Sequence, residues 1–161
     1  MDAQYFGFIN ELINRGFFQG LIASGILIIL CVLVHYEILL LLSNKVKKLK
    51  LIPKRTRVVV MMLGMFVAHS IHVWLFGITY YIVANWSASG TFLTAFSEPH
   101  HMTLMDGVYY SIVTYTSLGF GDIIPQDASR LITGVETLLG LLMIAWSASF
   151  TYLEMEKNWR V

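Results

Sequence analysis

Nine residues of this chain decide how the rest is organised, Thr-Tyr-Thr-Ser-Leu-Gly-Phe-Gly-Asp at positions 114–122. Glycine reaches positive φ angles at little cost, so Gly119 and Gly121 suit a backbone of alternating handedness. An apolar, aromatic-rich stretch, 104–116, leads into this motif. It is too short to cross a bilayer, which takes about 20 helical residues. We therefore expect a half-helix over 104–116 that enters a membrane and ends at the motif.

Thr103 and Asp106 lie three residues apart and fit a capping box at the start of this half-helix. Irregular backbone at membrane depth is tolerated only where it is buried in protein or lines a water-filled path. Alternating handedness aims successive carbonyls toward one axis, and a ring of such carbonyls can replace the hydration shell of a cation. The half-helix would point its partially negative C-terminal end toward the same axis. The motif therefore predicts a cation site.

The composition of the whole chain is that of a membrane protein. Of its 161 residues, 57% are apolar and 13% are charged, with a mean hydropathy of +0.67. Three apolar runs, 20–42, 58–84 and 131–153, reach spanning length and lack the alternation of barrel strands. We expect an all-α integral membrane protein with three transmembrane helices. The composition excludes a disordered chain, the single cysteine excludes a disulfide scaffold, and a net charge of +1 gives no reason to expect nucleic acid.

Basic residues gather between the first two apolar runs, at Lys45, Lys47, Lys48, Lys50, Lys54, Arg55 and Arg57. The positive-inside rule places this connection in the cytoplasm. Three spans then put the N-terminus outside and the C-terminus inside. The segment from Lys45 to Arg57 could also bind anionic lipid headgroups. Residues 1–19 fit either an interfacial amphipathic helix or a simple extension of the first span.

Residues 114–122 resemble the potassium-channel signature, which usually reads Thr-x-Thr-Thr-Val-Gly-Tyr-Gly-Asp. The resemblance runs from about Val58 to Leu153. Within it, His-Ser-Ile-His-Val-Trp at 69–74 and Gly-Leu-Leu-Met-Ile-Ala-Trp-Ser at 140–147 are similar to a small bacterial subgroup of single-pore-loop potassium channels. These belong to the two-transmembrane ion-channel family, to which this chain adds an N-terminal span. The resemblance implies passive K⁺ conduction by a homotetramer in the bacterial inner, or plasma, membrane.

The same resemblance assigns residues to the pore. The selectivity filter would bind K⁺ through the backbone carbonyls of Ser117, Leu118, Gly119, Phe120 and Gly121, with the Ser117 hydroxyl as a further ligand. Phe120 stands where the family has tyrosine, and loss of the phenol removes a hydrogen bond to the surrounding aromatic residues. Asp122 at the outer mouth would bond Tyr109, and Thr116 would also support the filter. No catalytic residue and no cofactor beyond K⁺ in the filter is expected.

The implied organisation has two parts. Residues 1–57 hold the amphipathic segment, the additional transmembrane helix and a basic cytoplasmic loop. Residues 58–161 form the pore domain, with an outer helix at 58–84, a pore helix at 104–116, the filter at 117–121 and an inner helix at 131–153. In the inner helix, Gly140 matches a hinge glycine, but it equally fits close packing between helices. A water-facing stripe that could close the path by dewetting comprises Leu141, Ile144, Ala148 and Tyr152.

Ionisable residues inside spans need a reason, since a charge at the centre of a span costs roughly 2.5–3.5 kcal/mol. We expect Glu136 to make a structural hydrogen bond to the backbone of the pore helix or filter. His69 and His72 stand one turn apart and, with His35, could form a pH-sensitive or metal site. Neutral histidines bonded between packed helices are the simpler interpretation. Two more candidates for pH sensing, His100 and His101, precede the half-helix.

Two alternatives to a potassium channel stay open at this point. A non-selective monovalent cation channel follows if Phe120 leaves the filter less rigid. A membrane protein that binds metal or haem through His35, His69 and His72 is the alternative from another class. The gating stimulus is equally open, with pH, lipid, membrane tension and an open leak all compatible with the residues.

Overall fold

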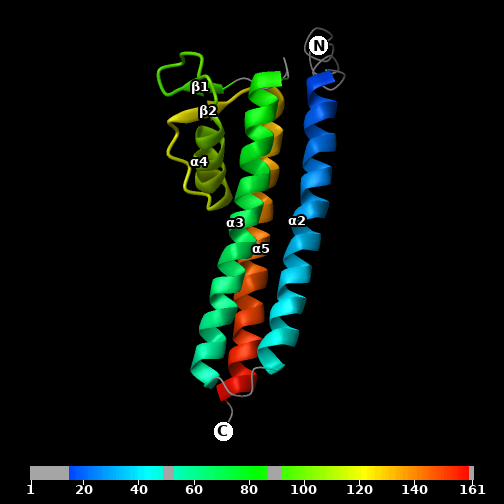
Figure 1. Cartoon of the computed structure of the whole chain (residues 1–161). Coiled ribbons are helices and arrows are strands. Elements are labelled where there is room, and N and C mark those ends of the chain that lie inside the picture. Colours follow the sequence, from blue (N-terminus) through cyan, green and yellow to red (C-terminus); the bar gives the residue numbers. More distant parts are fainter. Residues whose placement is uncertain (1–14, 49–52, 87–91, 160–161) are drawn as a thin grey trace, which may run out of the picture.

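The computed structural model describes residues 15–48, 53–86 and 92–159. Its elements, in chain order, are helices α2 (Arg15–Lys48) and α3 (Lys54–Trp86), strand β1 (Phe92–Thr94), helix α4 (Leu104–Tyr115), strand β2 (Ile123–Pro125) and helix α5 (Asp127–Trp159). The three long helices run side by side, and α4 and the two strands lie together beside one end of α3 (Figure 1). The chain is therefore mostly helical, as predicted.

The long helices coincide with the predicted spans and extend beyond them at both ends. They contain 34, 33 and 33 residues, against the runs 20–42, 58–84 and 131–153 expected from hydropathy. Helical hydrogen bonding propagates through polar residues as well as apolar ones, so hydropathy marks the membrane-length core and not the helix ends. Each helix is long and apolar enough to cross a membrane.

The connection between the first two spans is shorter than the predicted basic loop. Helix α2 continues through Lys48 and α3 begins at Lys54, so the basic residues of 45–57 lie largely on two helix ends. Residues 49–52 lie outside the described residues. So do residues 1–14 of the predicted amphipathic segment, whereas residues 15–19 belong to the structure's first long helix.

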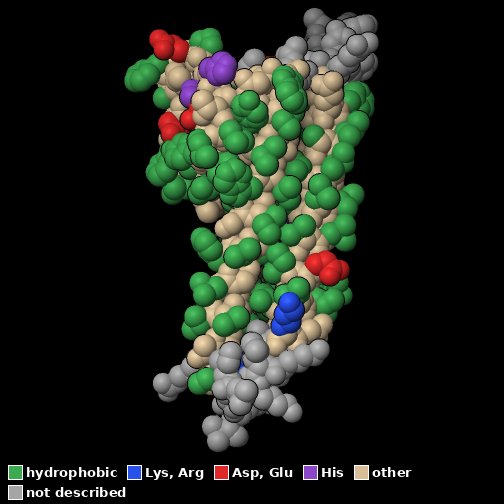
Figure 2. Space-filling model, viewed as in Figure 1, with side chains coloured by type: hydrophobic (Ala, Val, Ile, Leu, Met, Phe, Trp, Pro, Cys, Tyr) green, Lys and Arg blue, Asp and Glu red, His purple; other side chains and the backbone are tan. Residues whose placement is uncertain are grey.

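Apolar side chains cover the outside of the long helices (Figure 2). Ile22 and Leu63 are each 62% exposed and Phe66 is 71% exposed. Most of the acidic side chains and the histidines visible in Figure 2 lie around the strands and the start of α4. A surface this apolar is typical of contact with lipid or with neighbouring subunits, which agrees with a protein that spans a membrane.

Helix α4 packs tightly against α3 because glycines face each other where the two helices meet. A Cβ atom added to Gly107 would lie 2.5 Å from the carbonyl oxygen of Gly77, and one added to Gly77 would lie 2.8 Å from the Cα atom of Val108. Small residues of this kind let helix backbones approach closely in membranes. The buried aromatic residues Tyr80 and Tyr110 pack next to this contact, with ring centroids 4.9 Å apart.

The segments that enter and leave α4 are joined by a small sheet that the sequence did not predict. Strands β1 and β2 pair antiparallel, with Leu93 opposite Ile124. Strands of three residues are too short to show an alternating pattern. Asn85, near the end of α3, adds a second tie, since its side-chain amide donates to the carbonyl of Met102 at 2.9 Å. The start of α4 is thus anchored to α3, and the segments on either side of α4 are held to each other.

Candidate functional site

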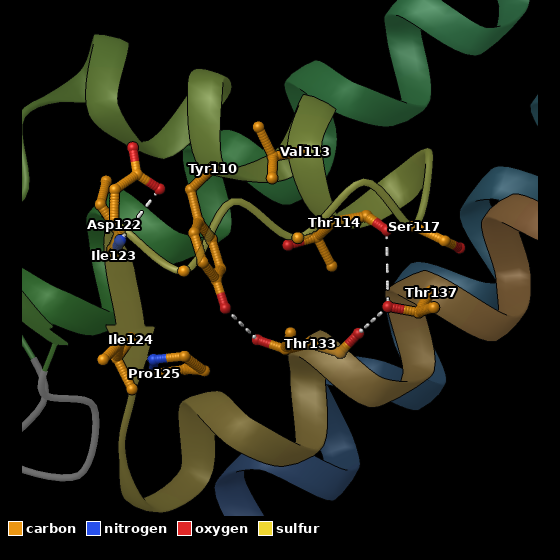
Figure 3. Close-up of a pocket in the computed structure, with 12 residues that line it drawn as sticks. Tyr110, Val113, Thr114, Ser117, Asp122, Ile123, Ile124, Pro125, Thr133 and Thr137 are labelled. Atoms are coloured by element: carbon orange, nitrogen blue, oxygen red, sulfur yellow. Dashed lines mark hydrogen bonds between the residues drawn. The ribbon is translucent and has the colours of Figure 1, made fainter. Parts of the chain in front are cut away.

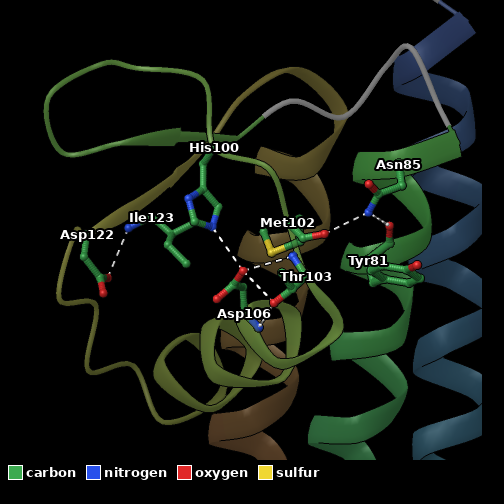
Figure 4. A network of polar contacts seen from close by, with 8 residues as sticks. All are labelled: Tyr81, Asn85, His100, Met102, Thr103, Asp106, Asp122 and Ile123. Atoms are coloured by element: carbon green, nitrogen blue, oxygen red, sulfur yellow. Dashed lines mark hydrogen bonds and ion pairs between the residues drawn. The ribbon is translucent and has the colours of Figure 1, made fainter.

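Helix α4 begins with the predicted capping box. The Thr103 hydroxyl oxygen accepts a hydrogen bond from the Asp106 amide at 3.2 Å, and the Asp106 carboxylate accepts from the Thr103 amide at 2.9 Å (Figure 4). His100 Nε2 lies 3.5 Å from the same carboxylate. The helix ends at Tyr115, one residue earlier than predicted, because Thr116 forms its C-cap.

Low pH should lower the stability of the start of α4. The hydrogen bond from the Thr103 hydroxyl, and then the Thr103 amide and nearby His100, hold the pKa of Asp106 below its ordinary 3.8. The unfolded chain therefore binds this proton at a higher pH than the folded chain does. The stabilisation is fully present above pH 3.8 and is lost as the pH falls through the lowered pKa. Thermal unfolding should show the wild type losing stability there relative to Asp106→Asn; parallel losses in both proteins would contradict this.

The backbone after α4 alternates in handedness, as the glycine spacing predicted. Gly119 has φ of 57° and Gly121 has φ of 76°. Ser117 also has a positive φ, 60°, which nothing in its side chain signals. A residue with a side chain pays roughly 1–2 kcal/mol in this region. Positive φ at every second residue from 117 to 121 indicates that surrounding contacts impose the conformation.

Those contacts come from the C-terminal turn of α4. The amides of Leu118 and Gly119 both donate to the carbonyl of Val113, at 2.9 and 3.3 Å, and the Ser117 amide donates to the carbonyl of Thr114 at 2.9 Å. The Thr116 hydroxyl donates to the carbonyl of Ile112 at 2.8 Å. These bonds use backbone amides of the 117–119 segment as donors. The carbonyl oxygens of residues 117–119 take no part in these hydrogen bonds.

The other end of the loop is held by a pair that the family resemblance predicted. Tyr109 donates its phenolic hydrogen to Asp122 at 2.6 Å, and the Ile123 amide donates to the other carboxylate oxygen at 3.1 Å. This hydrogen bond raises the pKa of Tyr109, because loss of the phenol proton would leave two negative oxygens in contact. The loop is therefore tied to α4 at both of its ends.

Glu136 is completely buried, and its partners correct the expectation of a backbone contact. One carboxylate oxygen accepts from the Ser111 hydroxyl of α4 at 2.5 Å, and the other accepts from the Tyr80 hydroxyl of α3 at 2.6 Å. The backbone groups inside α4 already bond within the helix, so side-chain hydroxyls provide the donors. Sequence reasoning missed both donors. The sequence signal that could have identified one donor was the hydroxyl of Ser111, within the predicted half-helix 104–116.

Removing either donor should destabilise the fold. Ser111→Ala or Tyr80→Phe leaves one oxygen of the buried Glu136 carboxyl group without its partner, at a cost of about 1–3 kcal/mol. Thermal unfolding in detergent measures the loss. Thr79→Val is a matched control, because among the described residues the Thr79 hydroxyl bonds only its own helix, at the carbonyl of Leu75. A loss no greater than that of Thr79→Val would show that the carboxyl does not need these donors.

Gly140 lies where α5 crosses the end of α4. A Cβ atom at this position would collide with the backbone carbonyl of Tyr115. The sequence allowed either a hinge or close helix packing at Gly140. This contact favours close packing as the reason for the glycine. Four residues that follow on α5 make up the predicted water-facing stripe: Leu141, Ile144, Ala148 and Tyr152. All four are exposed in the single chain, as are several of their neighbours.

A pocket of about 370 Å³ lies between the loop, α4 and α5 (Figure 3). At its edge the hydroxyls of Tyr110 and Thr133 are 3.0 Å apart, and Thr137 donates to the carbonyl of Thr133 at 3.0 Å. The loop's own apolar side chains stay uncovered, with Leu118 58% exposed and Phe120 64% exposed. One chain therefore offers an ordered loop with an unpartnered apolar surface.

The five histidines fall into two groups. His35, His69 and His72 come together where α2, α3 and α5 meet, with one ring nitrogen from each within 4.8 Å of the others. His100 pairs with Asp106, whereas His101 is exposed. His100 and His101 lie just before the start of α4, whereas the group of three lies near its end, in contact with Tyr115. The sequence suggested the first group, and the structure brings its members into contact.

The model of a family described as ion channel, with two transmembrane helices, matches residues 68–156. This chain belongs to the ion channel family. The match begins within α3 and continues through α4, the 117–121 loop and nearly all of α5. Helix α2 precedes it, so this ion channel carries an additional N-terminal helix. No curated protein and no solved structure matches the chain. Family membership and three apolar helices together make it a multi-pass membrane channel for ions.

Proposed function

We propose that this channel is selective for potassium and that residues Ser117 to Gly121 form its selectivity filter. The observation that carries the proposal is the positive φ of Ser117, Gly119 and Gly121, at every second residue. Alternating handedness turns successive carbonyls to one side. Rings of backbone carbonyls coordinate a dehydrated K⁺ ion in place of its water. The Ser117 hydroxyl supplies the innermost ring with a further oxygen.

The filter requires four chains. Each chain supplies one strand of carbonyls, and a closed rotational assembly makes the ring. The exposed Leu118 and Phe120 side chains support this proposal, because they offer apolar surface for a neighbouring subunit to bury. Helix α4 then acts as the pore helix, with its partially negative C-terminal end near the ion path.

Each supporting residue has a stated part in this proposal. The bonds from Leu118 and Gly119 to Val113 hold the inner half of the filter, with Thr116 at its base. Tyr109 and Asp122 hold its outer mouth. Glu136 on α5 bonds to α4 through Ser111 and to α3 through Tyr80. These three residues stabilise the helix packing from outside the ion path. Potassium sheds water, binds successive carbonyl rings and is displaced by the next ion.

The remaining assignments follow from this pore. Residues 58–161 form the pore domain, and Leu141, Ile144, Ala148 and Tyr152 line the path below the filter. The basic segment from Lys45 to Arg57 faces the cytoplasm, with the N-terminus outside, and contacts anionic headgroups of a cell membrane. No catalytic residue, no cofactor besides K⁺ and no nucleic-acid partner is part of the proposal.

Ion flux from proteoliposomes tests this function together with the oligomeric state. Purified full-length protein should release K⁺ down its gradient and elute from size exclusion as a tetramer in its detergent micelle. The Asp122→Asn variant, in which the hydrogen bond to Tyr109 is weaker, should conduct less K⁺ and still elute as a tetramer. A monomer, or vesicles no leakier to K⁺ than protein-free ones, would overturn the proposal.

A further inference from the structure

Three histidines meet in the membrane-spanning part of the molecule, away from the proposed filter. His35 comes from α2, and His69 and His72 come from α3. The ring of His35 lies 5.3 Å, centroid to centroid, from each of the other two, and those two are 6.0 Å apart. His35 and His72 are completely buried and His69 is half-buried. One nitrogen from each ring lies within 4.8 Å of the others.

Two hydroxyl groups make hydrogen bonds with these rings. The Tyr115 hydroxyl lies 2.8 Å from His69 Nδ1 and 3.0 Å from His72 Nδ1. The Ser147 hydroxyl lies 3.0 Å from His69 Nε2 and 3.2 Å from His35 Nε2. All three rings are thus oriented by partners on α4 and α5, not by one another.

Each of the two fully buried rings contacts these hydroxyl groups through one nitrogen only. Among the described residues, His35 Nδ1 and His72 Nε2 have no hydrogen-bond partner. The backbone of Cys31 on α2 also lies close to the His72 ring. A buried polar atom without a partner is costly. A ring nitrogen held by a hydrogen bond, with the opposite nitrogen free, is the arrangement of a metal-binding histidine and its outer partner.

We propose that His35, His69 and His72 bind one divalent transition-metal ion, such as Zn²⁺, between the three long helices. Imidazole nitrogen suits zinc, copper and nickel, whereas magnesium and calcium prefer oxygen. Three histidines and one further small ligand complete a tetrahedral zinc site. His69 gives up one of its two hydroxyl contacts to take part. The rings pack directly against one another, which favours a bare ion over a haem.

The ion would connect the additional helix to the pore. Helix α2 precedes the part of the chain that matches the family, and it supplies His35. Tyr115, which orients the other two histidines, is the last residue of α4 and lies two positions before Ser117. An ion bound here would fasten α2 to α3 behind the base of the proposed filter. This inference does not depend on potassium selectivity, because metal content is measured without ion flux.

The test counts metal bound to tag-free, full-length protein. The protein is stripped with a chelator, incubated with Zn²⁺, freed of excess ion by size exclusion and analysed by mass spectrometry of the metal. Wild type should retain one zinc per chain in the presence of excess Mg²⁺. His35→Gln and His72→Gln should retain little, while His101→Gln, which changes an exposed histidine, should match wild type. Equal zinc in wild type and His35→Gln would overturn the proposal.

Two measurements keep the test decisive if a buried variant misfolds. Co²⁺ added to wild-type protein should produce the visible absorption of a tetrahedral nitrogen site, and Zn²⁺ should remove it. Ser147→Ala should weaken zinc affinity about 10–100-fold, the usual cost of losing an outer partner, with an unchanged elution volume. A colourless Co²⁺ sample, or Ser147→Ala with wild-type affinity, would mean that the histidines only bond neighbouring hydroxyls.

Discussion

Gly119→Ala should lower potassium flux at least tenfold and leave the fold intact. Gly119 has φ of 57°, where an alanine pays roughly 1–2 kcal/mol. No described atom lies within 4 Å of an added Cβ, so the substitution acts through backbone conformation and not through a collision. Relief of this strain rotates the peptide and turns a carbonyl away from the ion path. Four copies in one ring lose four ligands together.

The size of the effect follows from the same cost. About 1.4 kcal/mol corresponds to a tenfold change in rate. Each of the four copies in the ring pays the cost, so flux should fall at least tenfold in vesicles that hold equal amounts of tetramer. Gly134→Ala is the matched control. It lies on α5, also has open space around an added Cβ, and has no positive φ. Undiminished K⁺ flux in Gly119→Ala would mean that the backbone at this residue does not shape the path.

Gly140→Ala should destabilise the protein, for a different reason. The added methyl group would collide with the Tyr115 carbonyl, a backbone atom that cannot move without shifting α4 and the loop behind it. Overpacking of this kind costs typically 1–3 kcal/mol. Tryptophan fluorescence during thermal unfolding in detergent measures the loss, again with Gly134→Ala as control.

A hinge at Gly140 would give the opposite result. Alanine improves the intrinsic helix propensity by about 1 kcal/mol, so a glycine needed only for bending would yield a more stable channel that opens less often. Gly140→Ala unfolding at or above the temperature of Gly134→Ala would therefore favour the hinge. Lower stability together with less folded tetramer would support close packing against Tyr115.

Local patterns made much of this structure predictable. The short apolar run before the motif, with Thr103 at its start, correctly placed α4 and its capping box. Glycine spacing correctly predicted positive φ at Gly119 and Gly121. The contact between Tyr109 and Asp122 followed from resemblance to the potassium-channel signature. Each of these features is either local in the chain or implied by the family resemblance.

Features that depend on packing between distant segments were not predictable in the same way. The positive φ of Ser117 is imposed by carbonyls on the preceding helix, and no serine signals it. Glu136 was recognised as needing a partner, but its donors come from two other helices. The approach of Gly77 to Gly107 likewise requires the helix pairing to be known. The sequence suggested that His35 groups with His69 and His72, but their distances and hydroxyl partners follow only from the helix packing.

Selectivity is the central claim, and reversal potentials test it most directly. Wild-type protein is reconstituted into planar bilayers with K⁺ on one side and Na⁺ on the other. A filter of carbonyl rings predicts a potential shifted strongly toward the K⁺ equilibrium potential, and replacing Phe120 with tyrosine should preserve or increase the shift. A reversal potential near zero in wild type, with K⁺ and Na⁺ carrying similar currents, would contradict it and identify a non-selective cation channel.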